Sequence, residues 1–295
     1  MLKLENLAEL LENNRAAASA RVKEFSIGGK KFNFNLQSAI MGVVNLSADS
    51  WYRESVCLSV ESAIQRGEIL AAQGADIVDI GAESTLANAT RASDESQKSQ
   101  LLPVIKQLRA EKILVSVETY SPKIARAALE AGVNVLNLTG NANAKEIFKM
   151  AAANDAAVII CYVQGKNVRE VGDFDFSADP IETMRDYFSR QIEIAQRNGL
   201  EKIFLDPGLG FYYRNLQDSA VRIRHQMNVF LNTFRLRELG FPVCHALPHA
   251  FEFFRNEVRS AEPFFAVLAA LGKTDLFRTH EVPRVKAVLE TMRAH

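Results

Sequence analysis

The sequence predicts an α/β protein, a (β/α)8 TIM barrel preceded by an N-terminal helix and β-hairpin. Eight short runs that are apolar almost throughout recur along the chain, as in parallel sheets whose strands are buried on both faces. A helical pattern follows each run, and 48% of the 295 residues are hydrophobic, which suffices for one large core. An open doubly wound sheet is the alternative, but "NLSADSWYRES" after the first run lacks the glycines of a dinucleotide-binding turn.

The N-terminal part is expected to precede the barrel. Residues 4–20 have the amphipathic pattern of a short helix, and "KEFSIGGKKFNFN" alternates about Gly28 and Gly29, which indicates a hairpin. We therefore divide the chain into an extension, residues 1–38, and a barrel, residues 39–295. The eight predicted strands are "AIMGVVN" (39–45), "DIVDIGAE" (76–83), "ILVSVET" (113–119), "VNVLNLTG" (133–140), "AVIICYVQ" (157–164), "KIFLDPG" (202–208), "PVCHALPH" (242–249) and "DLFRTHE" (275–281).

The helices between these strands have recognisable ends. Ser121-Pro122 and Asp179-Pro180 are typical of an N-cap residue followed by proline at the first helical position. The amphipathic segments 184–199 and 219–240 predict long helices of the outer ring. Left-handed C-caps are expected at the glycines that separate a helix from the next strand, which are Gly74, Gly132, Gly199, Gly240 and Gly272.

Composition excludes several classes of protein. Lys and Arg number 35 and Asp and Glu number 35, so no basic excess favours nucleic acid as a partner. Cys57, Cys161 and Cys244 lie too far apart to indicate a disulfide framework or a zinc site, and we interpret them as small buried hydrophobic residues. The N-terminus is unlike a signal peptide, and no apolar segment reaches about 18 residues. We expect a cytoplasmic protein without membrane segments.

Polar residues follow or end every predicted strand. TIM-barrel active sites lie at the carboxyl ends of the strands, so these side chains are expected to share one face. A carboxylate such as Asp206 in "KIFLDPGLGF" is costly to bury there unless a ligand or neighbour bonds it. Polar residues can stand at strand ends by chance, because every strand must end. Their presence at the ends of all eight predicted strands favours a ligand site. The residues are Asn45, Asp79, Glu83, Glu118, Asn137, Gln164, Asp206, His245, His249, Arg278 and His280.

The residue types indicate two kinds of contact. Glu118, Asn137 and Asp206 offer acceptors and donors that suit a flat heterocycle with N–H, amino and carbonyl groups. Arg278 and His280 from the eighth strand lie beside Asn45 from the first in the predicted order, a corner that suits a phosphate with Mg²⁺. A structural ion pair is an equal alternative for Arg278. We expect Glu83 to bond the backbone or Ser84 at the rim.

Six blocks of the sequence resemble the signature blocks of dihydropteroate synthase and the wider pterin-binding barrel family. They keep their order and approximate spacing from residue 39 to 282, and this family has a (β/α)8 barrel. The blocks are "MGVVNLSADSW", "GADIVDIGAEST", "VSVETYSPKIARAALEAGVNVLN", "LDPGLGF", "GFPV" and "FRTHEV".

The resemblance implies roles for most of the candidate residues. A 6-hydroxymethyl-dihydropterin pyrophosphate would bind deep in the barrel, with Asp206 and Asn137 on the polar edge of the pterin, Glu118 as a second acid and Asp79 beneath them. Asn45 would contact Mg²⁺ and pyrophosphate, and Thr85, Arg278 and His280 would complete the anion pocket. Para-aminobenzoate would then attack the pterin methylene as pyrophosphate leaves. The resemblance also implies a homodimer formed through the later helices.

Several positions depart from the family pattern. Leu86 stands where the family has arginine, and Pro248, His249 and Ala250 stand for serine, arginine and lysine. Ala48 replaces proline, Trp51 replaces phenylalanine, and Glu118 is about one methylene longer than the usual aspartate. Each lost charge-assisted bond costs roughly 1.5–3 kcal/mol, and only His249, when protonated, replaces a lost cation. We predict a divergent paralogue, a transferase of the dihydropteroate synthase type with altered substrate sites and weakened or lost normal turnover.

The sequence leaves three other functions open. The first is a pterin-binding relative that transfers to another amine or acid, or that binds without catalysis. The second is methyl transfer from a reduced folate, as in related barrels, although those work with a cobalamin domain for which this chain has no room. The third is an unrelated barrel enzyme. The residues that usually select the second substrate are the replaced ones, so the sequence does not identify that substrate.

Overall fold

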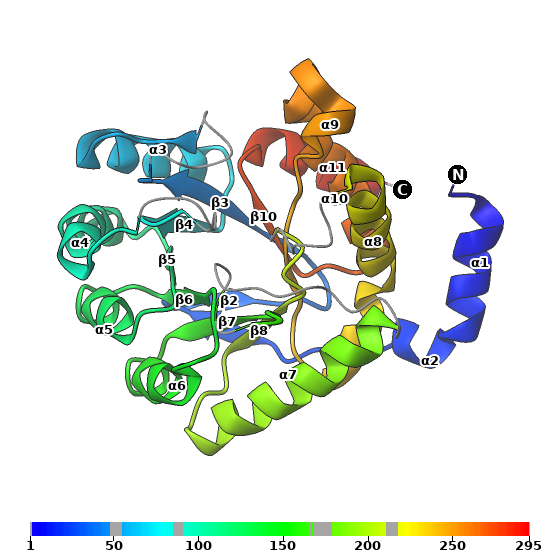
Figure 1. Ribbon diagram of the computed structural model, residues 1–295, viewed down its shortest axis with the longest axis horizontal. Helices are drawn as coiled ribbons and strands as arrows, with labels where there is room; N and C mark the ends of the chain where they lie inside the picture. The colour runs from blue at the N-terminus through cyan, green and yellow to red at the C-terminus, as the bar shows by residue number, and fades with distance from the viewer. Residues whose placement is uncertain are drawn as a thin grey trace.

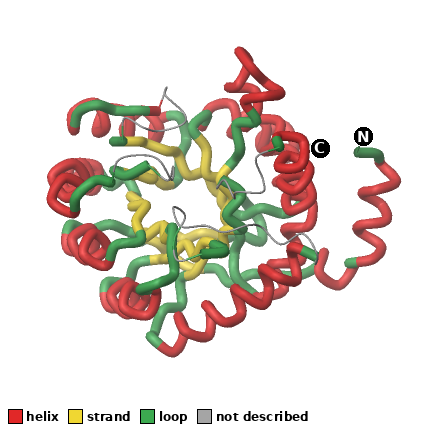
Figure 2. The backbone as a smooth tube through the Cα atoms, viewed as in Figure 1, coloured by secondary structure: helices red, strands yellow, loops and turns green. Residues whose placement is uncertain are grey.

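A computed structural model describes residues 2–47, 55–84, 91–165, 167, 179–210 and 218–294. Eight parallel strands form a barrel surrounded by helices (Figures 1 and 2), which confirms the predicted fold class. Neighbouring strands follow the order β8-β7-β6-β5-β4-β3-β10-β9. The barrel strands are β3 (Ala39–Asn45), β4 (Ile77–Gly81), β5 (Val115–Thr119), β6 (Val135–Leu138), β7 (Ala157–Cys161), β8 (Ile203–Asp206), β9 (Cys244–Ala246) and β10 (Leu276–Thr279).

Each of the eight predicted strands lies where the apolar run placed it, but most are shorter. The flanking polar residues form the turns at the strand ends instead of extending the ladder. The barrel closes between β8 and β9 through a single bridge, in which the Leu205 amide donates to the Pro242 carbonyl at 2.9 Å.

Helices cover the outside of the barrel, and Ser121 and Asp179 cap α5 and α7 as predicted. The Ser121 hydroxyl accepts from the Ile124 amide at 3.5 Å, and the Asp179 carboxylate accepts from Ile181 at 2.9 Å. The elements are α3 (Val60–Ala72), α4 (Asp94–Ala110), α5 (Pro122–Glu130), α6 (Ala144–Ala153), α7 (Pro180–Arg197), α8 (Ser219–Asn232), η2 (Thr233–Leu239), α9 (Phe251–Phe254), η3 (Arg255–Ser260), α10 (Ala261–Leu271) and α11 (Val282–Arg293).

Four of the five predicted glycine C-caps have positive φ, and Gly272 is the exception. Its φ is −81°, and Lys273 takes the left-handed conformation with φ 62°. The predicted left-handed C-cap at Gly272 was therefore wrong, although the position does require glycine. A Cβ at position 272 would lie 1.7 Å from the Phe230 carbonyl oxygen, so glycine is required by the close approach of α10 to α8.

The N-terminal residues form two helices and a hairpin. The predicted helix over residues 4–20 is divided at Asn14 into α1 (Leu4–Asn13) and α2 (Arg15–Ala18), so its continuity was wrong. The hairpin of β1 (Phe25–Ile27) and β2 (Lys30–Phe32) turns at Gly28 and Gly29 as predicted. Among the described residues, no helix is both long and apolar enough to cross a membrane.

The hairpin packs on the barrel at the amino ends of its strands. The rings of Phe25 and Phe34 meet the ring of Phe204 edge-on, with centroids 5.2 and 5.3 Å apart. These side chains join an apolar cluster with inward residues of the barrel strands, including Ile77 and Val135. The boundary at residue 38 stays a prediction.

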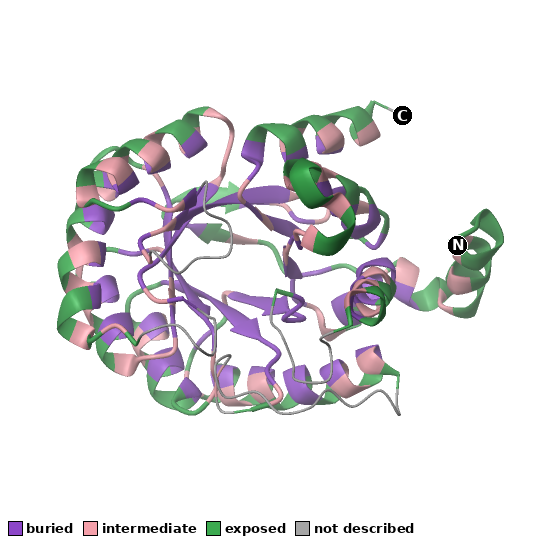
Figure 3. Cartoon of the chain, turned by 45° about the horizontal axis from the view of Figure 1, so that its top comes forward, coloured by how far each residue is buried: buried purple, intermediate pink, exposed green. Residues whose placement is uncertain are grey.

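Alternation along the strands creates two layers inside the barrel, whose strands are buried throughout most of their length (Figure 3). Ile77 and Val135 belong to the lower apolar layer. Two residues further along the same strands come Asp79 and Asn137, on the same inward face. The carboxyl ends of the strands therefore bring polar groups above an apolar floor.

Candidate active site

A cavity opens at the carboxyl ends of the strands and contains most of the candidate residues. Its walls come from seven of the barrel strands or the loops that follow them, and from the start of α8. The lining includes Asn45, Ser47, Glu83, Ser84, Glu118, Asn137, Thr139, Asp206, Leu209, Gly210, Arg222, Gln226, Ala246, Leu247, Pro248, His249, Ala250, Arg278 and His280.

Arg278 lies among the carboxylates of this cavity. Its Nε donates to Asp79 Oδ2 at 2.7 Å, and a terminal nitrogen donates to Glu118 Oε2 at 2.6 Å. The Asp79 side chain is fully buried, and those of Glu118 and Arg278 are 12% and 15% exposed. Arg278 thus forms the ion pair that was one of its two predicted roles, and it does so inside the cavity. One guanidinium compensates two acids.

Burial and neighbouring negative charges raise the pKa values of two carboxyl groups in the cavity toward neutral pH. Burial raises the pKa of Glu118 to about 7; Arg278 opposes this shift and neighbouring carboxylates add to it. Burial also raises the pKa of Asp206 to about 6, against the hydrogen bond from the Gly208 amide at 2.8 Å. For Arg278, burial acts to lower the pKa, but the paired acids outweigh it and raise that pKa. Near neutral pH these carboxyl groups can therefore accept hydrogen bonds from a ligand when ionised and donate them when protonated.

Asn137, on the fourth barrel strand, lies next to the acids of the second and third strands. Its amide nitrogen donates to Asp79 Oδ2 at 3.1 Å, and in the sheet register Asn137 lies directly beside Glu118. The other oxygen of Asp79, Oδ1, is buried without a hydrogen-bond partner in the described part of the chain. An acceptor buried in this way is costly, which favours an N–H-bearing molecule at this level of the barrel.

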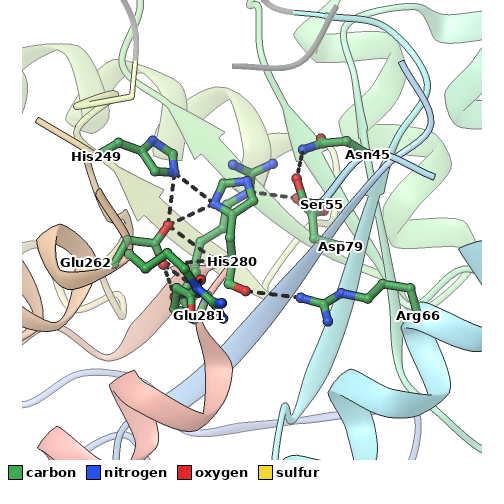
Figure 4. Close-up of polar contacts among 11 residues, drawn as sticks. Asn45, Ser55, Arg66, Asp79, His249, Glu262, His280 and Glu281 are labelled. Atoms are coloured by element: carbon green, nitrogen blue, oxygen red, sulfur yellow. Dashed lines mark hydrogen bonds and ion pairs between the residues drawn. The ribbon is translucent and has the colours of Figure 1, made fainter. Parts of the chain in front are cut away.

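A second corner of the cavity contains Asn45. Its amide nitrogen donates to the Ser55 hydroxyl at 2.7 Å (Figure 4), so a cation at this side chain would meet the amide oxygen. One amide oxygen fits Mg²⁺, which keeps several waters and is bound mainly through substrate phosphates. The donor set is consistent with a magnesium ion that enters with a phosphorylated substrate.

A third corner joins two histidines to a buried acid. His249 Nε2 and His280 Nδ1 lie 3.2 and 2.8 Å from Glu262 Oε1, and 3.3 Å from each other (Figure 4). Burial acts to raise the pKa of Glu262, but the hydrogen bonds from both rings outweigh it and lower that pKa well below its usual range. Glu262 is therefore ionised, and it orients the two rings.

Comparisons with known proteins agree with this geometry. Residues 41–244 match the pterin binding enzyme family. The chain belongs to this family. It is 32% identical to the dihydropteroate synthase of Clostridium beijerinckii over 74% of this chain and 76% of that one, and 29% identical to that of Synechocystis over 87% and 89%. The structure of Xanthomonas albilineans dihydropteroate synthase with 4-aminobenzoic acid superimposes with a TM-score of 0.76 at 26% identity, over 92% of this chain and 97% of that one.

These matches confirm the resemblance inferred from the six blocks. The chain is a dihydropteroate synthase-like member of the pterin-binding family. They do not favour a methyltransferase, and membership of the family excludes an unrelated barrel enzyme.

Most of the site residues predicted from the sequence lie together in the structure. Asn45, Glu118, Asn137, Asp206, His249, Arg278 and His280 line one cavity with Asp79 below, as the order of the strands predicted. Glu83 bonds the backbone as expected, since its carboxylate accepts from the Ala92 amide at 3.1 Å and from the Tyr120 hydroxyl at 2.6 Å. Thr85, Leu86, Ala48 and Trp51 lie outside the described residues.

Two strand-end residues do not join the site in the predicted way. His245 points outward, because it alternates with the inward Cys244 and Ala246. It contacts the Thr233 hydroxyl at 2.7 Å, and burial lowers its pKa to about 3. Gln164 lies beyond the end of β7, and its amide donates to the Tyr162 hydroxyl at 2.6 Å.

Three site residues were missed from the sequence. Arg222 and Gln226 line the cavity from α8, and their spacing of four residues placed them on one helical face. Glu262 is the only charged residue of the apolar helix α10. A lone acid in such a helix signals a buried carboxylate that needs partners.

Proposed function

We propose that the protein binds 6-hydroxymethyl-7,8-dihydropterin pyrophosphate in the barrel cavity and transfers the pterin to para-aminobenzoate or a related acceptor. The observation that carries this proposal is the convergence of Asp79, Glu118, Asn137 and Asp206 at the base of one cavity, in a barrel of the pterin-binding family. A reaction in folate biosynthesis follows from this substrate.

Ring recognition would use the groups on the strands. Carboxylates of Asp206 and Glu118 accept from the amino and N–H groups of a pterin, and the Asn137 amide both donates and accepts. Because the pKa of Glu118 lies at about 7, its protonated form can also donate to a ring carbonyl. Arg278 would either bond that carbonyl or keep the acids compensated while the ligand binds.

Departure of pyrophosphate requires its charge to be neutralised. The acceptor nitrogen forms a bond to the pterin methylene, the C–O bond breaks with its electron pair on pyrophosphate, and the nitrogen then loses a proton. Mg²⁺ bound through Asn45 would supply positive charge at the leaving oxygens. His280 and His249 lie on the same cavity wall and would contribute when protonated.

The acceptor site has lost charge relative to the family pattern. Pro248 and Ala250 line the cavity without any charged group, beside His249. The Xanthomonas relative has 4-aminobenzoic acid bound. We therefore propose a similar aromatic amine or acid as acceptor, with slow turnover because fewer groups hold it.

Product formation in a single turnover would test this function directly. Enzyme in excess over the pterin pyrophosphate, with para-aminobenzoate and Mg²⁺, is expected to form a condensed product that chromatography detects. Calorimetry with the pterin and with its pyrophosphate is run beside it. Binding of both without product would leave a pterin-binding protein that uses another acceptor. No binding of either would reject the proposal.

We also propose a cytoplasmic homodimer. Helix α10 exposes Phe264, Val267 and Leu271 at helical spacing, by 44%, 37% and 49%. An exposed apolar stripe on one of the later helices is consistent with an interface between two copies. Light scattering should give twice the chain mass, and charged substitutions at Phe264 and Val267 should return it to the monomer value.

A further inference from the structure

Three potential ligand atoms from separate segments meet at the edge of the cavity. They are Nε2 of His249 after β9, Oε1 of Glu262 in the first turn of α10, and Nδ1 of His280 after β10 (Figure 4). The three atoms form a small triangle with edges of 2.8, 3.2 and 3.3 Å.

Protons cannot satisfy all three edges of this triangle at once. Each ring nitrogen carries at most one proton, and the ionised carboxylate carries none. If both rings donate to Glu262, two N–H groups face each other. If only one ring carries its proton there, the other nitrogen and the carboxylate oxygen face each other as two acceptors. With the carboxylate ionised, each of these arrangements leaves two like groups facing each other, whereas a single cation would accept all three lone pairs.

The size of the triangle fits a metal ion. Bonds of about 2.0–2.2 Å from a metal to nitrogen and oxygen place neighbouring ligand atoms roughly 2.8–3.6 Å apart, from octahedral to tetrahedral geometry. We propose that His249, Glu262 and His280 bind a divalent transition-metal ion such as Zn²⁺ or Fe²⁺. Two imidazoles and one carboxylate favour such an ion over Mg²⁺, which prefers oxygen ligands.

The surroundings of Glu262 hold it as a metal ligand would be held. Its second oxygen, Oε2, accepts from the backbone amides of His280 and Glu281 at 3.0 and 3.1 Å and from the Thr279 hydroxyl. These bonds fix the carboxylate plane, and Oε1, which the His280 amide also approaches at 3.3 Å, is directed at the two rings. Arg66 donates to the His280 carbonyl at 3.3 Å and so fixes the segment that carries the second histidine.

The open positions of this ion would face the cavity. Both histidines line it, with side chains 15% and 10% exposed, while Glu262 is fully buried behind them. An anionic oxygen of a ligand, such as a phosphate oxygen, would complete the coordination. The anion-binding role of the ion rests on the proposed function, because the ion would supply the positive charge that Pro248 and Ala250 lack. The metal site itself does not depend on that function.

Metal binding is tested with the full chain after treatment with a chelator. Co²⁺ and Zn²⁺ are titrated separately, and Co²⁺ binding is followed by its visible absorption, which reports the ligand geometry. We expect about one ion per chain, displacement of Co²⁺ by Zn²⁺, and no displacement by Mg²⁺. Absence of a stoichiometric site in the wild-type chain would overturn the proposal.

Matched variants locate the site. Glu262→Gln and His249→Ala are each expected to weaken Co²⁺ binding at least about 100-fold, whereas His225→Gln, a histidine of α8 outside the triangle, should leave it unchanged. If Glu262→Gln fails to fold, His249→Ala retains the test, because its side chain lies at the cavity surface. Unchanged affinity in a folded His249→Ala or Glu262→Gln variant would overturn the assignment of the ligands.

Inorganic pyrophosphate separates the metal site from the proposed function. Its affinity for the wild-type chain is expected to rise at least about tenfold with Zn²⁺ present, and this gain should vanish in His249→Ala. A metal-loaded chain without that gain would reject the anion role alone. A chain that binds metal but no pterin would reject the proposed function while leaving the metal site in place.

Discussion

The cavity has two polar regions that differ in how they are built and charged. The strand cluster comprises Asp79, Glu118, Asn137, Asp206 and Arg278, and all five lie on barrel strands. The histidine corner comprises His249, Glu262 and His280, from a loop, a helix and the segment after β10. Carboxyl pKa values are raised to about 7 and 6 in the cluster and lowered at Glu262 in the corner.

This difference indicates a division of tasks. The cluster has more acids than cations, so it suits a ligand edge rich in N–H donors, and the sheet holds it rigidly. The corner has one acid that is fully hydrogen-bonded and two rings that can gain positive charge or bind a cation, so it suits an anion. Substitutions in the cluster should therefore affect stability and ring recognition, and substitutions in the corner should affect anion recognition.

The largest effect is expected from removing the cation of the cluster. Arg278→Met leaves Asp79 and Glu118 buried without their partner, which should lower the free energy of unfolding by about 3–5 kcal/mol near pH 8. The loss should shrink near pH 5, where Glu118 and Asp206 are largely protonated. Urea unfolding at both pH values measures this.

An exposed ion pair supplies the control for that experiment. Arg126 pairs with Glu146 at 3.4 Å, with side chains 57% and 54% exposed, so Arg126→Met should change stability by less than about 1 kcal/mol at either pH. Equal losses in the two variants would show that Arg278 does not compensate the buried acids Asp79 and Glu118.

A pH dependence of stability should follow from Glu118. Its pKa is raised from 4.5 to about 7 in the folded chain, so the folded state binds more protons than the unfolded state between these values. Stability contributed by this group therefore falls as pH rises from 4.5 through 7, by a total on the order of 3 kcal/mol. Glu118→Gln should flatten that slope, and an unchanged slope would assign it to other groups such as Asp275.

Ring recognition should depend on Asp206. Asp206→Asn is expected to weaken binding of the pterin and of its pyrophosphate alike, by roughly 10- to 100-fold, because one charge-assisted hydrogen bond is lost. Asp155→Asn, at an 85% exposed carboxylate far from the cavity in sequence and fold, is the matched control. Calorimetry with both ligands measures the change; an effect on the pyrophosphate alone would place Asp206 in anion recognition.

The smallest effect is expected in the histidine corner. In buffer freed of transition metals and supplied with Mg²⁺, His280→Gln should weaken the pterin pyrophosphate by about tenfold. The affinity for the pterin itself should stay unchanged. Equal losses for the two ligands would remove the distinction between the regions.

The strand cluster could be predicted from the sequence because two simple rules place it. Parallel strands bring their carboxyl ends to one edge, and alternation of side chains puts Asp79 and Asn137 two residues above apolar partners. The same alternation, applied strictly, would have excluded His245, which lies between two inward residues.

The histidine corner could be predicted only in part. His249 and His280 follow strands and were expected at the rim, but Glu262 reaches them from α10, and its contact depends on how that helix packs. Local sequence does not fix such packing. Arg222 was missed for a similar reason, because a helix of the outer ring was expected to serve packing alone, whereas the start of α8 also lines the cavity.

The hairpin beneath the barrel has a consequence for the first 38 residues of the chain. Phe25 and Phe34 press against Phe204, and Phe204 precedes Asp206 by two residues on the same face of β8. The hairpin thus supports from below the strand that carries this acid, although none of its residues reaches the cavity. A truncated chain that begins at β3 would expose a ring of phenylalanine and apolar side chains to water, and substrate affinity would fall together with solubility.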